Sequence, residues 1–190
     1  MRINRAGSTG GGRQPYAGTL LLAHPNLLDA NFRRSVILLS AHSEQGSIGV
    51  VVNRPINRTL GQYDAEMSNS LLADVPLFFG GPVDSQQLIL AAWKWSEEEG
   101  TFKLYFGIDG EKALRLQAED SGYQLRGFLG HAGWGEGQLD AELNQDSWVL
   151  SGRLPALEDP SGAVDWHSLL CQERPDLRLL ADAPDDPSLN

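Results

Sequence analysis

A glycine-rich segment in the C-terminal half of the chain has the residue types that most suggest a binding site. Residues 123–129 form an apolar run, four glycines follow within residues 130–137, and a helical pattern begins at Gln138. A strand, a glycine turn and a helix in this order can bind phosphate, because free backbone N–H groups and the helix dipole attract anions. The glycine spacing matches neither the dinucleotide fingerprint nor the P-loop, and Glu136 would repel a phosphate. We therefore expect a tight turn that seats Trp134 against the core rather than a phosphate site.

Three arginines provide a second candidate. Arg33 and Arg34 precede one predicted strand, and Arg54 follows another. If the two strands pair, the guanidinium groups could converge and bind an anionic ligand or an acidic partner. The alternative is that each arginine pairs with one of the 25 acidic residues of the chain.

Residues suited to metal binding or nucleophilic catalysis have the wrong spacing. None of the four histidines has a partner at the spacing of metal ligands, so we expect no metal and no cofactor. The single cysteine, Cys171, lies among apolar residues in a predicted helix, which favours a buried structural thiol. Asp140 and Glu142 are two positions apart and would point away from each other on a helix. We assign no catalytic residue.

The composition limits the class of protein. The chain has 190 residues and a formal net charge of −10, which argues against direct nucleic-acid binding because that requires a basic surface. The charge also disfavours anionic membranes, and no apolar run reaches the roughly 20 residues that span a bilayer. One cysteine permits no internal disulfide, and residues 1–16 lack the apolar core of a signal peptide. These features predict a cytoplasmic protein with no membrane contact.

The order of the predicted elements indicates an α+β fold. Short runs rich in β-branched residues, such as residues 35–41 and 48–53, are joined by a polar loop and predict an antiparallel strand pair. Helices are expected over residues 59–71, 109–118 and 164–172. The mixture of hairpins and interspersed helices predicts a mixed, largely antiparallel sheet with flanking helices.

The chain is expected to form one domain. At 190 residues, a single domain is the default. Residues 17–181 contain the predicted elements, whereas residues 1–16 are polar and glycine-rich and residues 182–190 are acidic. We expect disordered tails over both terminal segments.

Four sequence blocks carry a family resemblance. They are GTLLLAHPNLLDANFRRSVILLSAH, GSIGVVVNRP, FFGGPV and GFLGHAGWGEGQLDAEL, with Trp148 downstream. In this order, over Gly18 to Arg178, they resemble the YqgE/AlgH family of bacterial proteins; the chain departs from it at His24, where Met is common. The resemblance implies a compact α/β fold with a bifurcated, pseudo-barrel-like sheet. It implies no catalytic residue, and some members carry the label of transcriptional regulator.

The motif positions of this family define the candidate site. They are Phe32, Arg33, Arg34, Asn53, Arg54, Pro55, Gly80, Gly81, Pro82, Trp134, Gly137, Gln138 and Glu142. We hypothesise that they form a groove for a protein partner or a small anionic ligand, in a non-enzymatic binding or regulatory module. Two alternatives remain. One is an enzyme of unknown reaction that uses Arg54 and Glu142, and the other is a transcriptional regulator, which would need a contiguous basic face.

Overall fold

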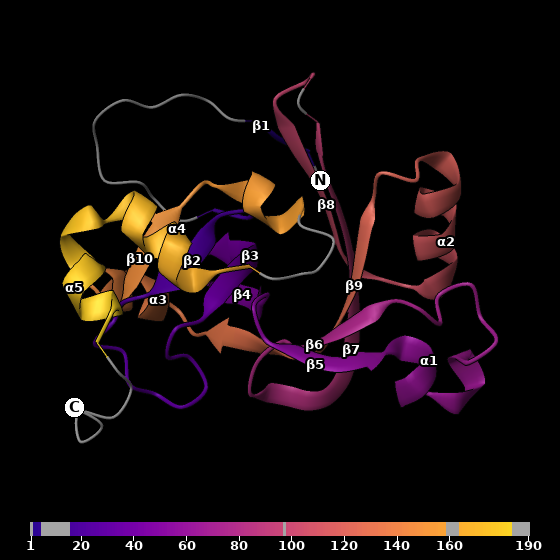
Figure 1. Ribbon diagram of the computed structural model, residues 1–190, viewed down its shortest axis with the longest axis horizontal. Coiled ribbons are helices and arrows are strands. Elements are labelled where there is room, and N and C mark those ends of the chain that lie inside the picture. The colour runs from indigo at the N-terminus through magenta and orange to yellow at the C-terminus, as the bar shows by residue number, and fades with distance from the viewer. Residues whose placement is uncertain (1, 5–15, 97, 159–163, 184–190) are drawn as a thin grey trace.

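A curled β-sheet organises the computed structural model, which describes residues 2–4, 16–96, 98–158 and 164–183 (Figure 1). The strands are β1 (Arg2–Asn4), β2 (Leu20–Ala23), β3 (Val36–Ser43), β4 (Gly46–Val51), β5 (Pro55–Thr59), β6 (Pro76–Phe79), β7 (Val83–Ser96), β8 (Thr101–Ile108), β9 (Gln124–Trp134) and β10 (Trp148–Ser151). The helices are α1 (Leu60–Tyr63), α2 (Gly110–Glu119), α3 (Gln138–Asn144), α4 (Trp166–Glu173) and α5 (Arg178–Ala181). Short 3-10 helices lie at Ala65–Met67, Leu154–Glu158 and Pro175–Leu177. The predicted α+β class is confirmed.

The sheet divides into two branches at β9. The strand order is β1-β8-β7-β9-β4-β3-β2-β10, and β5 and β6 form a side branch that joins β9. β6 runs parallel to β9, with Phe78 opposite Phe128. The other pairs are antiparallel. The sheet is therefore mixed and largely antiparallel, and it curls into a half-barrel, in agreement with the bifurcated sheet that the resemblance implied.

Glycines at the branch point allow three strands to meet at close range. Gly80 follows β6, and its N–H donates to the Leu129 carbonyl of β9 over 2.8 Å. The Gly80 carbonyl accepts from the Val51 N–H of β4, also over 2.8 Å. A Cβ atom on Gly80 would lie 2.2 Å from the Gly130 carbonyl oxygen, so no side chain fits there. The branching of the sheet thus depends on the absence of a side chain at Gly80.

The predicted turn over residues 130–137 is wrong in its first half. β9 continues to Trp134, and only residues 135–137 separate it from α3. Gly130 lets two strands approach each other rather than reverse the chain, because a Cβ there would lie 2.4 Å from the Gly81 carbonyl oxygen. Glycine density alone does not distinguish these two uses. The predicted helix that begins at Gln138 is confirmed, and Gly137 precedes it with a φ of 64°, where glycine is favoured.

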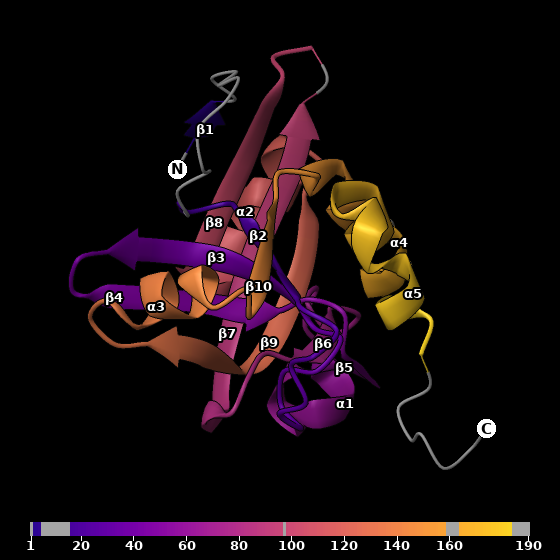
Figure 2. The same ribbon diagram turned by 90° about the vertical axis from the view of Figure 1, so that its left-hand side faces the viewer.

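Side chains on both faces of the β10-β2-β3-β4 part of the sheet are buried. Because side chains alternate along a strand, Leu20 and Leu22 of β2 share one apolar cluster with Trp166 of α4. Leu21 belongs to a second cluster on the other face, with Leu139 of α3. Figure 2 shows α3 and α4 on either side of β2 and β10. This two-sided burial explains the continuous apolar runs of these strands.

The predicted helices are confirmed in part. Asp109 caps α2, because its side chain accepts a hydrogen bond of 2.7 Å from the Lys112 N–H. The helix expected over residues 59–71 is interrupted after one turn. There Asp64 accepts from the Glu66 N–H over 2.9 Å and starts a separate 3-10 helix. The apolar periodicity of this segment predicted one continuous helix, but the hydrogen bond of the Asp64 side chain to the backbone ends the first helix and begins the second.

The structure describes only parts of the expected tails. Residues 2–4 form β1, antiparallel to β8 with Ile3 opposite Phe102, so this short part of the expected N-terminal tail is a strand. Asp182 and Ala183 follow α5, Tyr16 precedes β2, and the other tail residues lie outside the described residues. In the part of the chain that the structure describes, no helix is both long and apolar enough to cross a bilayer.

Candidate functional site

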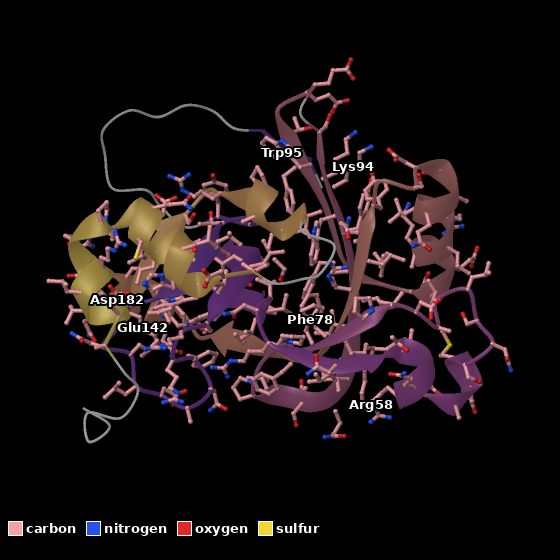
Figure 3. The ribbon with its side chains drawn as sticks, viewed as in Figure 1. Arg58, Phe78, Lys94, Trp95, Glu142 and Asp182 are labelled. Atoms are coloured by element: carbon pink, nitrogen blue, oxygen red, sulfur yellow. The ribbon has the colours of Figure 1, made fainter. Side chains whose placement is uncertain are left out.

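Glu142 on α3 joins two tryptophans from different strands. Its Oε2 atom accepts from the indole N–H of Trp134, the last residue of β9, over 2.9 Å. The same atom accepts from the indole N–H of Trp148, the first residue of β10, over 2.7 Å. Figure 3 places Glu142 at the end of the molecule opposite α2. One carboxylate therefore ties α3 to both strands.

The first turn of α3 orients this carboxylate. Gln138 lies one turn before Glu142 on the same face of the helix. Its side-chain amide donates to Glu142 Oε1 over 2.8 Å. The oxygen of the same side-chain amide accepts from the Gly135 N–H over 3.1 Å. The turn after β9, the helix and the carboxylate are thus connected by one chain of hydrogen bonds.

Three aromatic rings pack edge to face beside Glu142. The Trp134 and Trp148 centroids are 5.9 Å apart with an interplanar angle of 80°. Phe32 meets Trp148 at 5.9 Å and 74°. The tryptophans are only 7% and 4% exposed. Because a buried indole N–H needs an acceptor, Glu142 allows both rings to be buried at this position.

The rings and the carboxylate line a cavity of about 330 Å³, which we call the aromatic pocket. Its lining residues are Leu27, Asp29, Phe32, Gly133, Trp134, Gln138, Glu142, Ser147 and Trp148. One wall is the loop between β2 and β3, and the opposite wall is α3 with the ends of β9 and β10. Four of the predicted site residues, namely Phe32, Trp134, Gln138 and Glu142, meet in this pocket.

Asn53, another predicted site residue, holds the loop wall from behind. Its side-chain oxygen accepts from the Val36 N–H over 2.9 Å, and its amide nitrogen donates to the Arg34 carbonyl over 2.9 Å. Within the loop, the Asp29 side chain accepts from the Asn31 N–H over 2.9 Å. The amide of Asn53 therefore fixes the point at which the loop enters β3.

The Arg54 side chain supports the same loop by donating hydrogen bonds to backbone carbonyls of the loop. The guanidinium group donates to the Ala30 carbonyl over 3.4 Å and to the Arg33 carbonyl over 3.0 Å, and it lies 6.0 Å from the Phe79 ring centroid. Burial lowers the pKa of Arg54, the charge of Arg33 lowers it further, and Asp29 opposes them. The sequence hypothesis that each arginine pairs with an acidic side chain missed these carbonyl contacts.

Arg34 is directed to another part of the molecule. It donates to the Ala183 carbonyl over 2.6 Å, and its guanidinium carbon lies 5.5 Å from the Trp166 ring centroid. Its backbone has a φ of 53°. Arg34 thus fastens the loop to the C-terminal helices, whereas Arg54 holds it against the sheet.

The remaining predicted residues lie in the frame of the site or outside it. Gly80 and Gly81 occupy the branch point described above, and Pro55 in β5 lies opposite Phe78. Gly137 is the N-cap of α3. Pro82 lines a separate, open hollow of about 590 Å³ together with residues 84–87. The order of motifs in the sequence could not separate these structural roles from pocket lining.

Sequence reasoning missed Leu27, Asp29 and Ser147 as pocket residues and gave Trp148 no role in the site. The available signal was the pair of tryptophans on either side of α3, with a glutamate between them. A buried indole N–H needs an acceptor, but this does not identify Glu142 as the acceptor of both indoles, and the loop residues Leu27 and Asp29 carry no comparable signal.

Cys171 differs from its predicted burial and has a neighbour that the sequence reasoning missed. The thiol is half-buried, and its sulfur lies 3.7 Å from His167 Nε2, one helical turn away. The same nitrogen lies 2.6 Å from Asp182 Oδ1. His167 Nε2 therefore lies between the Asp182 carboxylate and the Cys171 thiol. In the described residues, no group of three or more metal-ligating side chains comes together.

Comparisons with known proteins place this geometry in a family. A family model described as AlgH-like matches residues 20–176. A UPF0301 protein of Streptomyces coelicolor is 37% identical over 91% of this chain and 94% of its own length. A UPF0301 protein of Chlorobium luteolum is 34% identical over 92% of this chain and 94% of its own length.

Two solved structures have the same fold. The AlgH protein of Pseudomonas aeruginosa is 25% identical, with a TM-score of 0.60 over 93% of this chain and 98% of its own. Protein DIP2367 of Corynebacterium diphtheriae is 24% identical, with a TM-score of 0.65 over 90% of this chain and 94% of its own. The family match and the sequence relatives lead to one conclusion: this chain belongs to the AlgH-like family.

Proposed function

We propose that the protein is a non-enzymatic binding module and that a protein partner docks over the aromatic pocket. The observation that carries this proposal is Leu28, which is 80% exposed between two pocket-lining residues, Leu27 and Asp29. An exposed leucine next to a pocket lined by aromatic rings extends the apolar surface that a partner could cover, and aromatic residues are enriched among the contacts that dominate protein binding. A small ligand inside the pocket would leave Leu28 in water.

The hydrogen bonds of Glu142 and Arg54 favour binding over catalysis. Glu142 accepts from Trp134 and Trp148, and Arg54 donates to two loop carbonyls. An acid or base must exchange protons with a substrate, and these groups are instead engaged in holding the walls of the pocket. A regulatory effect on transcription would then pass through the partner, since the net charge of −10 opposes contact with nucleic acid.

The charges of the pocket favour a protein partner over a small anionic ligand. Asp29 and Glu142 line it, and both are acidic. An anion would have to approach both carboxylates in a chain that is already strongly acidic, which costs electrostatic free energy.

The test is quantitative affinity capture from cell extract with the immobilised protein and three variants. Leu28→Ser and Phe32→Ala alter the rim and the wall of the pocket. Leu71→Ser is the matched control, because Leu71 is 86% exposed and lies outside the pocket. We expect at least one protein to bind to the wild type and to Leu71→Ser, and to be depleted about tenfold or more on the other two variants, which corresponds to a loss of about 1.4 kcal/mol of binding free energy. The proposal is wrong if no captured protein depends on Leu28 or Phe32.

A further inference from the structure

We infer that the aromatic pocket receives the cationic side chain of an arginine or lysine of the partner. This inference rests on the proposed function and adds the chemical class of the anchoring group. It follows from the charges of the lining residues, from the acceptor capacity that remains on the carboxylates and from the aromatic rings.

The lining residues carry only negative charge. Asp29 lies on the loop wall and Glu142 on the helix wall, and the described lining includes no lysine, arginine or histidine. A cationic group between the two walls would therefore meet a carboxylate from each side. The net charge of −10 also accelerates the approach of basic surfaces at moderate ionic strength.

The carboxylates retain acceptor capacity for a ligand. A carboxylate offers about four acceptor positions. Trp134 and Trp148 share Oε2 of Glu142, while Gln138 alone donates to Oε1. On Asp29, Oδ1 accepts from the Asn31 N–H. One position on Glu142 and the other oxygen of Asp29 are therefore suited to the N–H groups of a guanidinium or ammonium ion.

The aromatic rings add a second attraction for a cation. Phe32, Trp134 and Trp148 meet at interplanar angles of 74° and 80°. Ring faces attract cations, and the effect strengthens where water is excluded. A cavity of about 330 Å³ has room for the end of one long side chain, not for a folded segment of chain. The pocket is thus suited to one basic side chain, with Leu28 in contact with the partner around it.

Arg33 and Arg54 are the positive charges that oppose this inference. Arg54 lies behind the loop, where its guanidinium group donates to carbonyl oxygens, and its pKa is sensitive to both Arg33 and Asp29. If these arginines dominated the potential in the pocket, an anionic group would bind in preference to a cationic one. An anionic probe therefore belongs in the experiment.

The experiment follows the indole N–H resonances of Trp134 and Trp148 by NMR in the full-length protein. The probes are N-acetyl-arginine amide, N-acetyl-lysine amide, the uncharged analogue N-acetyl-citrulline amide, and N-acetyl-glutamate amide. We expect saturable shifts of both indoles with the two cationic probes and at least about fivefold weaker binding of citrulline, as for the loss of one charge interaction of about 1 kcal/mol. Asp29→Asn, which keeps an acceptor oxygen, should weaken the arginine probe about threefold to fivefold.

Asp140→Asn is the matched control, since it removes the same charge from an exposed position on α3 outside the pocket. It should leave the arginine titration unchanged. Equal binding of arginine and citrulline, preferential binding of glutamate, or no saturable shift with either cationic probe would overturn the inference. If the cationic probes fail while protein capture still depends on Leu28 and Phe32, the proposed function stands without the charge preference. If they bind but no captured protein depends on these residues, the partner is excluded and both proposals fall.

Discussion

The indole N–H of Trp148 donates to Glu142 Oε2 over 2.7 Å, which joins the first residue of β10 to the middle of α3. A hydrogen bond to an ionised acceptor is stronger than a neutral one, and this oxygen serves Trp134 as well. The pocket wall is therefore formed before any partner arrives. Pre-organisation of this kind lowers the entropic cost of association.

Removal of the Glu142 carboxylate should destabilise the fold. Glu142→Ala leaves two buried indole N–H groups without their acceptor, and we expect a loss of about 2–4 kcal/mol in the free energy of unfolding. Glu142→Gln retains one carbonyl oxygen and should cost about 1 kcal/mol. Urea unfolding measures both values, with Asp140→Ala on the exposed face of α3 as the control. A Glu142→Ala variant as stable as that control would show that the indoles do not depend on this carboxylate.

The branch point of the sheet should not accept a methyl group at Gly80. Its Cβ would lie 2.2 Å from the Gly130 carbonyl oxygen, which is backbone and cannot move aside easily. We expect Gly80→Ala to cost about 3 kcal/mol or more. Gly137→Ala is the comparison, because its Cβ meets no atom within 4 Å and the cost arises only from a φ of 64°, which amounts to about 1 kcal/mol. Equal losses in chemical denaturation would contradict the role given to Gly80.

Loss of the Asn53 side chain should loosen the loop wall of the pocket. Asn53→Ala removes the hydrogen bonds to the Val36 N–H and the Arg34 carbonyl, at a cost of about 1–2 kcal/mol. Hydrogen exchange followed by mass spectrometry should show that the variant exchanges faster than the wild type in peptides covering residues 29–36, with a smaller change in peptides covering β8. Uniform acceleration across the chain would mean that Asn53 supports the whole fold rather than this loop.

His24 should make stability depend on pH. Burial lowers the pKa of His24 below its usual value of 6.5, Arg174 acts in the same direction, and Asp146 and Asp176 oppose it. Its Nδ1 also accepts from the Asn26 N–H over 3.2 Å, which requires the unprotonated nitrogen.

Below pH 6.5 the unfolded chain therefore takes up the proton before the folded chain does, so the contribution of neutral His24 is present above this pH and is lost as the pH falls toward the folded-state pKa. We expect the wild type to lose more stability than His24→Met between about pH 7.5 and 5.5, a range that lies around the ordinary histidine pKa. Urea unfolding at the two pH values measures the free energy of unfolding of both proteins. Equal losses in the wild type and in His24→Met would exclude His24 as the cause.

The sequence predicted the fold where local chemistry and tertiary contacts agree. Asp109 both ends a strand and caps α2, so the helix was found at nearly its observed bounds. The apolar runs of β3 and β4 were found for the same reason. At Gly130 the prediction failed, because this glycine packs against Gly80, which is 50 positions away in the chain. The local sequence pattern gives no sign of that contact.

The candidate site was predicted in outline but not in its interactions. The motifs contained Phe32, Trp134 and Glu142, which the structure brings together in one pocket. They gave no sign that Glu142 serves two indoles or that Arg54 binds carbonyls, because those partners come from separate strands and from a loop. Leu28, which carries the functional proposal, has no distinguishing sequence pattern, and only its 80% exposure beside the pocket singles it out.

The most direct test of the proposed function is site-specific photo-crosslinking in cells. A photoreactive phenylalanine analogue replaces Leu28 or, as the control, Leu71, which are 80% and 86% exposed. The account predicts a discrete crosslinked protein from position 28 that is absent from position 71 and is lost when Phe32→Ala is added. The same crosslinks from both positions, or a crosslink from position 28 that persists with Phe32→Ala, would contradict a partner seated over the aromatic pocket.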